Sequence, residues 1–134
     1  MKKEIFNKEM LAYCAAFIDG EGCLRFDYRL KKNGEGKKYM THMPTCQITN
    51  TDFDLIELLY KHFGEEGSTH IRKPRLKTDG VSFTEPQMMW QIQYKKLYRL
   101  LQLISPFILH KDKKHVAKEI IEWYQSREKR NTIQ

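Results

Sequence analysis

Two acidic residues separated by a glycine stand where a short apolar helix is expected to end. In the sequence Phe17-Ile18-Asp19-Gly20-Glu21-Gly22 a glycine follows each acid, and glycines let the backbone turn sharply and expose its carbonyl groups. A helix C-terminus carries partial negative charge, so a cation is favoured there. Carboxylate and carbonyl oxygens are the ligands that Mg²⁺ and Ca²⁺ prefer. The spacing therefore indicates a divalent-cation site, and a solvated acidic turn is the alternative that this short motif leaves open.

A second group of residues has the chemistry to read nucleic acid. Alternating positions in two strand-like regions carry side chains that can make bidentate contacts to guanine and adenine edges in the major groove. The turns that follow are rich in lysine, which suits phosphate contacts. Polar residues also alternate along any strand that has one face in solvent. What distinguishes a nucleic-acid-binding face from an ordinary solvent face here is its shortage of acidic residues, with Asp27 the exception. The predicted DNA-binding residues are Arg25, Arg29, Gln47, His70, Arg72, Arg75 and Gln91.

The overall charge points to the same class of partner. Lys and Arg outnumber Asp and Glu by 24 to 17 in 134 residues. This suits nucleic acid better than a membrane, because no strongly basic amphipathic helix, apolar span or signal region is visible. Three cysteines without C-x-x-C spacing argue against a disulfide framework or a zinc site. We expect an intracellular protein without a targeting signal; an organelle, a phage-infected cell and a bacterial cytoplasm all fit.

The elements that must position these residues follow from hydrophobic periodicity. The first helix, with Asn7 as its N-cap, is apolar around most of its circumference and must be buried on more than one side. The order α-β-β-α-β-β-α-α predicts an α+β domain with helices on one face of an antiparallel sheet. We assign residues 1–125 to a single domain and 126–134 to a charged C-terminal tail. The predicted helices are 8–19, 52–63, 96–104 and 112–125, and the predicted strands are 23–30, 39–49, 68–76 and 85–94.

One narrow stripe of the first helix carries almost no side-chain bulk. Small residues on one stripe let two helix backbones approach closely, whereas a generic alanine-rich core helix is the alternative. No second copy of this helix sequence occurs in the chain, so a helix partner would come from another copy, and a two-fold dimer is the simplest arrangement. The predicted dimer interface follows i, i+3, i+4, i+7 spacing and consists of Ala12, Ala15, Ala16 and Asp19.

The segment from Leu11 to Gly22 resembles the motif that names the LAGLIDADG homing endonucleases. The likeness extends to the order of the elements and to Gln47-Ile48-Thr49-Asn50, which resembles the end of that family's second strand. Pro106-Phe107-Ile108-Leu109-His110-Lys111 is similar to its P-F-L-x-x-K segment. Ala16 departs from the pattern, because many members have glycine there. The resemblance implies a saddle-like antiparallel sheet that binds DNA.

The resemblance also implies a role for each residue of the site. Glu21 would bind the metal, helped by the carbonyl of Gly20, and the acids of two subunits would hold divalent ions near the scissile phosphates. Lys111 would help to organise the water network or offset transition-state charge, and Asn50 would order water, so both belong to the catalytic group. Asp19 would brace the helix junction. The implied cofactor is Mg²⁺, and Ca²⁺ or Mn²⁺ could occupy the same site.

We therefore expect an intron-encoded, homodimeric homing endonuclease. It would make metal-dependent double-strand breaks with 3′ overhangs at a near-palindromic site in duplex DNA. The alternative is an intron RNA maturase, which would bind intron RNA, or a DNA-binding protein of the same fold that does not cut. Both acids and Lys111 are present, which favours retained catalysis. The sequence leaves the target open, and also which face of the last strand meets DNA, because a bulge would invert the alternation.

Overall fold

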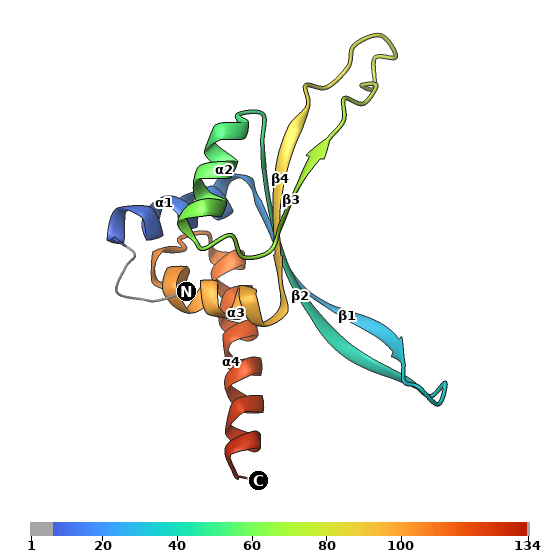
Figure 1. Cartoon of the computed structure of the whole chain (residues 1–134), viewed down its shortest axis with the longest axis vertical. Coiled ribbons are helices and arrows are strands. Elements are labelled where there is room, and N and C mark those ends of the chain that lie inside the picture. Colours follow the sequence, from blue (N-terminus) through green and yellow to red (C-terminus); the bar gives the residue numbers. More distant parts are fainter. Residues whose placement is uncertain (1–6, 134) are drawn as a thin grey trace.

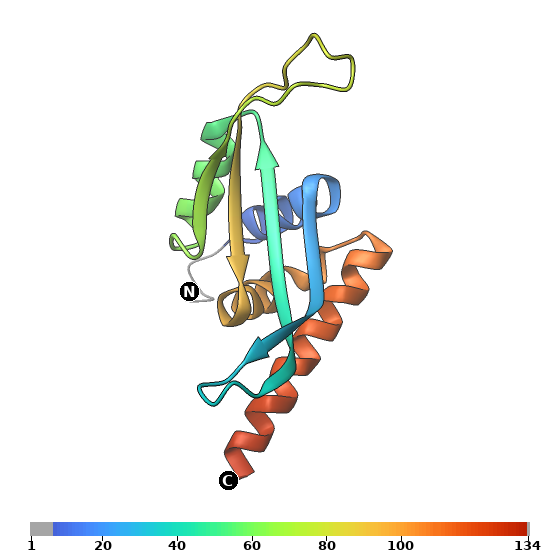
Figure 2. The same cartoon turned by 90° about the vertical axis from the view of Figure 1, so that its right-hand side faces the viewer.

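A four-stranded antiparallel sheet carries the α-helices on one of its faces in the computed structural model, which describes residues 7–133 (Figure 1). The strands lie side by side in the order β1-β2-β4-β3 (Figure 2). This arrangement confirms the predicted α+β class. The elements are α1 (Lys8–Glu21), β1 (Gly22–Lys32), β2 (Lys38–Asn50), α2 (Phe53–His62), β3 (Ser68–Arg72), β4 (Gln87–Gln93), α3 (Tyr94–Ile104), the short 3₁₀ helix η2 (Ser105–Phe107) and α4 (Lys111–Ile133).

The hydrophobic core lies between the sheet and the helices. Leu24, Cys46 and Ile92 are successive Cα partners across β1, β2 and β4, and all three are buried. Burial raises the pKa of the Cys46 thiol to about 12, so this cysteine behaves as a small apolar side chain. Trp90 is also buried, and its indole donates a hydrogen bond to the Glu66 carbonyl at 2.7 Å. The alternation of β4 therefore keeps the regular register, with Trp90 and Ile92 facing the helices.

The second hairpin is interrupted where the sequence predicted continuous strands. We predicted strands over 68–76 and 85–94, but β3 ends at Arg72 and β4 begins at Gln87. Pro74 lies just beyond β3, and proline has no amide hydrogen to donate to a sheet ladder. Pairing resumes as an isolated bridge between Leu76 and Phe83. This part of the hairpin projects away from the body of the molecule (Figure 1).

The last helix is longer than predicted. We placed its end at Gln125, followed by a charged tail, whereas α4 continues to Ile133. Contacts to α3 and within α4 hold the added turns. The Arg127 guanidinium lies 4.5 Å from the Trp123 ring, and the Tyr98 hydroxyl donates to a Glu128 carboxylate oxygen at 3.2 Å. Within the described residues, no helix is both long enough and apolar enough to cross a membrane.

A close backbone contact fixes the junction between α1 and β1. A Cβ atom added at Gly22 would lie 2.6 Å from the Cα atom of Ile18, whose side chain is fully buried. That separation is far below a normal van der Waals contact, and Ile18 cannot move without disturbing the core. Only glycine therefore fits at the residue where the helix turns into the strand.

We predict that Gly22→Ala destabilises the protein, because the added methyl group must displace the α1 backbone. Overpacking of this kind costs about 1–3 kcal/mol in the free energy of unfolding. Gly34→Ala is the matched control, since a Cβ atom there meets nothing within 4 Å. Urea denaturation followed by tryptophan fluorescence measures both variants. Equal stability of the two would contradict the close approach at Gly22.

Candidate metal and nucleic-acid site

The last turn of α1 and the first turn of α4 hold each other through reciprocal hydrogen bonds. The Asp19 carboxylate accepts from the backbone amides of Leu109 and His110, at 2.8 Å and 3.2 Å. The Lys113 ammonium donates to the backbone carbonyls of Ile18 and Asp19, at 2.7 Å and 2.8 Å. Each contact puts a charge where the helix dipole favours it, an anion ahead of α4 and a cation at the end of α1. We call this set of contacts the α1–α4 clamp.

The clamp separates the two acids of the motif. Asp19 is half-buried and engaged with the chain leading into α4, as its bracing role requires, whereas Glu21 is exposed. Sequence reasoning missed Lys113. It lies in the basic run 110–115, and no feature of spacing or residue type distinguishes its ammonium from those of Lys111 and Lys114. Only the folded arrangement shows which lysine reaches α1.

Asn50, at the end of β2, holds the Glu21 carboxylate. Its Nδ2 donates to Glu21 Oε2 at 2.8 Å, while its Oδ1 accepts from the Asp52 amide at 2.7 Å. Because the amide oxygen is committed to that backbone N–H, the Asn50 nitrogen is the group that faces Glu21. Asp52 in turn caps α2 by accepting from the amides of Asp54 and Leu55. The structure thus brings together Glu21 and Asn50, which the sequence predicted to share a site.

The end of α1 offers the oxygen atoms that a hard divalent cation takes. Glu21 presents an exposed carboxylate directly after Gly20, whose carbonyl belongs to the last turn of the helix. Lys113 already binds the neighbouring carbonyls, so this helix end attracts positive charge. Over residues 7–133, no three His, Cys, Asp or Glu side chains gather into a ready metal cluster. One chain therefore supplies a partial ligand set, and its chemistry fits Mg²⁺ or Ca²⁺.

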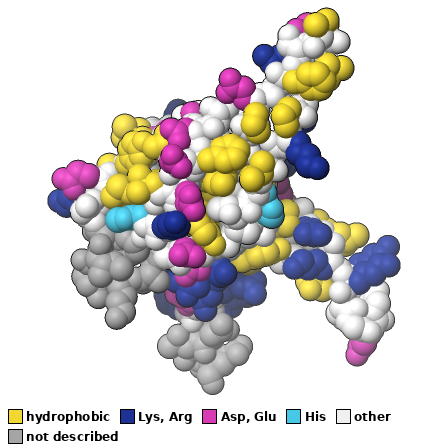
Figure 3. All heavy atoms as spheres, turned by 45° about the horizontal axis from the view of Figure 1, so that its top comes forward, with side chains coloured by type: hydrophobic (Ala, Val, Ile, Leu, Met, Phe, Trp, Pro, Cys, Tyr) yellow, Lys and Arg dark blue, Asp and Glu magenta, His cyan; other side chains and the backbone are white. Residues whose placement is uncertain are grey.

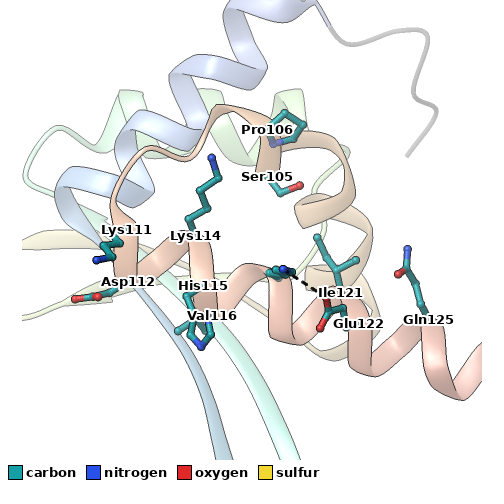
Figure 4. A pocket seen from close by; sticks show the side chains of 11 residues that line it. Ser105, Pro106, Lys111, Asp112, Lys114, His115, Val116, Ile121, Glu122 and Gln125 are labelled. Atoms are coloured by element: carbon teal, nitrogen blue, oxygen red, sulfur yellow. Dashed lines mark ion pairs between the residues drawn. The ribbon is translucent and has the colours of Figure 1, made fainter.

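Lys111 is the first residue of α4 and is exposed. With Asp112, Lys114 and Pro106 it lines a cavity of about 830 Å³ beside the first turns of that helix (Figure 4). Among the contacts of the described residues, no hydrogen bond or ion pair joins Lys111 to Glu21. Within one chain, the described contacts therefore join Asn50 to Glu21 and include no hydrogen bond from Lys111 to either residue.

The exposed side of α1 differs from the predicted interface. Ala15 is fully buried in the core of its own chain, so its assignment to the dimer interface is wrong. Ile18, three residues later, lies on the same side of the helix and draws Ala15 into the core with it. Asp19 is half-buried in the clamp. The residues that do form one exposed stripe, which we call the α1 stripe, are Ala12, Tyr13, Ala16 and Gly20.

The helix-free face of the sheet gathers most of the residues predicted to bind DNA. Gln47 on β2 is the partner of Gln91 on β4, and their side-chain amides meet at 3.2 Å. Cys23 on β1 and Ser68 on β3 extend the same row. Because side chains alternate along a strand, residues an even number of positions from this row share its face. The predicted residues on it are Arg25, Arg29, Gln47, His70, Arg72 and Gln91.

Local contacts hold some of these side chains in place. The Arg25 guanidinium pairs with the Asp27 carboxylate at 3.0 Å, so the single acid on this part of β1 orients an arginine. The Ser68 hydroxyl and the His70 ring lie 3.0 Å apart. Arg75, the remaining predicted residue, stands outside β3 at an odd spacing from Arg72. The structure therefore does not bring Arg75 into the same row.

Comparison with known proteins identifies the fold. No family model and no curated protein matches the sequence. The homing endonuclease I-CvuI, solved with DNA, matches 86% of this chain and 65% of its own, at 16% identity and a TM-score of 0.57. The LAGLIDADG homing endonuclease I-SmaMI, bound to cleaved DNA, matches over 92% of this chain and 38% of its own, at 23% identity and a TM-score of 0.58. The archaeal intron-encoded homing endonuclease I-Vdi141I, complexed with DNA, matches 84% of this chain and 66% of its own, at 19% identity and a TM-score of 0.52.

These likenesses are structural. At 16–23% identity they show that the chain has the LAGLIDADG homing endonuclease fold. The fold predicted from the segment Leu11 to Gly22 is thereby confirmed. The chain spans 65% of the length of I-CvuI and 38% of that of I-SmaMI.

We predict that Lys113→Met weakens the α1–α4 clamp. The substitution keeps an apolar stem but removes the charged donor from the carbonyls of Ile18 and Asp19. Hydrogen bonds to a charged group contribute about 1.5–3 kcal/mol, so the free energy of unfolding should fall by that order. Lys114→Met, at the exposed neighbouring position, should change it by less than about 0.5 kcal/mol. Denaturant titration of both variants measures the free energy of unfolding. A Lys113→Met protein as stable as wild type would rule out the clamp as a stabilising contact.

Proposed function

We propose that this chain is a metal-dependent DNA endonuclease that acts as a homodimer on a near-palindromic site in duplex DNA and leaves 3′ overhangs. The observation that carries the proposal is the exposed Glu21 carboxylate, held by Asn50 at the end of α1. β1 begins at the next residue, so this carboxylate borders the face that carries the arginine and glutamine side chains. The structural neighbours support it, because they are homing endonucleases solved with DNA.

The charge distribution supports DNA as the partner. The sequence has a formal net charge of +7, and the helix-free face presents Arg25, Arg29 and Arg72 beside a pair of glutamines. Lysine is concentrated at the tip of the β1–β2 hairpin, at positions 31, 32, 37 and 38. In Figure 3 the arm at the lower right carries a cluster of Lys and Arg side chains. Base edges would meet the strands and phosphates would meet the hairpin tips.

The residues at the end of α1 have separable tasks. Glu21 and the Gly20 carbonyl would hold the divalent ion, and I-CvuI was crystallised in the presence of Mg and of Ca. Such an ion supplies an activated hydroxide and a Lewis acid for phosphodiester hydrolysis. Asn50 fixes the direction of the Glu21 carboxylate, because its own amide is oriented by Asp52. Lys113 holds the helix end that presents these oxygens.

Cutting both strands requires a second copy of the chain. One Glu21 serves one scissile phosphate, and the α1 stripe is the surface through which two copies would meet. Its residues are small apart from Tyr13, and Gly20 lies directly before Glu21. A two-fold contact along this stripe would bring the two carboxylates together at the dyad. The metal site and the dimer interface would then be parts of one structure.

We predict that Glu21→Gln abolishes cleavage and retains DNA binding. Glutamine keeps the size of the side chain and an oxygen that accepts from Asn50, but it removes the negative charge. Loss of outer-shell partners alone lowers metal affinity or activity by about 10–100-fold, so loss of the ligand itself should exceed that range. Duplexes of roughly 30 base pairs, enriched from a randomised pool by binding, serve as substrates in Mg²⁺. A Glu21→Gln protein that cuts as fast as wild type would refute the assignment.

We predict that Ala16→Arg produces a folded monomer. Ala16 is exposed, so the larger side chain meets no core residue, but it would set two like charges against each other across a two-fold axis. Leu58→Arg on α2 is the control, because Leu58 is 50% exposed and lies outside the α1 stripe. Light scattering coupled to gel filtration should show a dimer for wild type and Leu58→Arg. A dimeric Ala16→Arg protein would place the interface elsewhere.

A further inference from the structure

The tip of the β3–β4 segment is a hydrogen-bonded hairpin of its own. Leu76 and Phe83 form an antiparallel bridge, and the Lys77 amide donates to the Ser82 carbonyl at 2.8 Å. We call residues 75–84 the outer hairpin. It stands clear of the helices and of the body of the sheet (Figure 1, Figure 2). Its side chains therefore meet solvent or a partner, and none of them can be buried in the core.

The acid at the tip of the outer hairpin has a structural task. The Asp79 carboxylate accepts from the amides of Val81 and Ser82 at 2.9 Å, and from the Ser82 hydroxyl at 2.7 Å. These hydrogen bonds lower the pKa of Asp79, because they stabilise its charged form. The carboxylate thus closes the turn and fixes the position of Val81 at its apex.

Three large apolar side chains are exposed on this small element. Leu76 is 57% exposed, Phe83 is 64% exposed and Val81 is 80% exposed. In Figure 3 the upper arm shows a patch of hydrophobic side chains, whereas the lower arm carries hydrophobic side chains together with a cluster of Lys and Arg. Isolated exposed apolar residues are ordinary, but several on one projecting tip mark a contact surface. Lys73, Arg75 and Lys77 flank the patch, and so make it complementary to a polyanion.

The apolar residues continue the row that faces away from the helices. Arg72 pairs with Gln87, and Leu76 pairs with Phe83, each four residues further toward the tip. The register of the sheet is therefore kept through the interruption at Pro74. The bridge puts Leu76 and Phe83 directly opposite each other, and Val81 lies beyond them in the turn at the apex. The face changes from arginine and glutamine on the strands to apolar side chains on the outer hairpin.

We propose that the outer hairpin reads thymine, by packing Leu76, Val81 and Phe83 against C5-methyl groups in the major groove. This rests on the proposed function, because it requires the helix-free face to lie on duplex DNA. The thymine methyl is the apolar group that a base pair presents in that groove. Val81 and Phe83 contact the methyl groups while Lys77 and Arg75 contact the phosphates on either side. In a homodimer the two outer hairpins read two symmetric positions.

The experiment starts from binding, without added divalent metal, to a pool of duplexes with roughly 30 randomised base pairs. Wild type should enrich thymine at a symmetric pair of positions away from the centre. Replacing those thymines by uracil removes only the methyl groups. It should weaken wild-type binding about fourfold per methyl group, the effect of uncovering one carbon-sized apolar contact.

Two variants separate apolar reading from charge. Val81→Ser with Phe83→Ser should bind the thymine and uracil duplexes equally, with an unchanged slope of log Kd against log salt concentration. Lys77→Ala should keep the thymine preference and reduce the salt slope by about 0.9 for each phosphate that the lysine no longer neutralises. All three substituted residues are exposed, so none of the changes disturbs the core.

The outcomes distinguish the two proposals. If wild type enriches no duplex, the proposed function fails and the thymine contact fails with it. If wild type enriches a site but the serine variant discriminates thymine from uracil as well as wild type does, the thymine contact is refuted and the proposed function stands. If the serine variant alters the oligomeric state instead of the base preference, the tip is a contact between protein chains, and the inference is overturned.

Discussion

The α1–α4 clamp determines where the candidate metal site lies. Helix ends leave backbone amides and carbonyls unpaired, and here two helix ends satisfy each other through Asp19 and Lys113. The buried side of α1, formed by Cys14, Ala15 and Ile18, fixes the rotation of the helix about its axis. Together these constraints set the direction of Glu21 and of the α1 stripe. If α1 were rotated about its axis by one residue, Glu21 would turn by about 100° and the α1 stripe would no longer face outward.

The same constraint explains why two neighbouring acids have different roles. Asp19 faces the amides that precede α4, where a carboxylate is stabilised by the helix dipole. Glu21 lies beyond the last clamped carbonyl and faces Asn50 and solvent. A single acid in this motif could either brace the helix junction or bind a cation, but not both. With glycine between them, one acid stabilises the helix junction and the other remains available to a ligand.

Local sequence patterns predicted which faces of the strands and helices are buried, but they did not predict contacts between residues far apart in the chain. Alternation along β1, β2 and β4 placed the arginine and glutamine row opposite Trp90 and Ile92, and the capping role of Asn7 is confirmed by its bond to the Met10 amide. Ala15 was misplaced because small residues pack equally well inside a chain or between chains. Lys113 was missed because the atoms it joins lie 95 and 94 residues away in the chain. No local periodicity records a contact at that separation.

The arrangement of Glu21 makes the proposed chemistry conditional on assembly. One chain presents one carboxylate beside a helix carbonyl, a ligand set that leaves most positions of a hard cation to water, phosphate or a partner. A second copy across the α1 stripe and the phosphates of a duplex would each improve the site, so dimerisation, DNA binding and metal binding become linked equilibria. Binding of any one component would then raise the affinity of the chain for the others. In the proposed mechanism, a chain that met DNA alone would hold its metal weakly, and this would protect that DNA from single-strand cuts until both copies were in place.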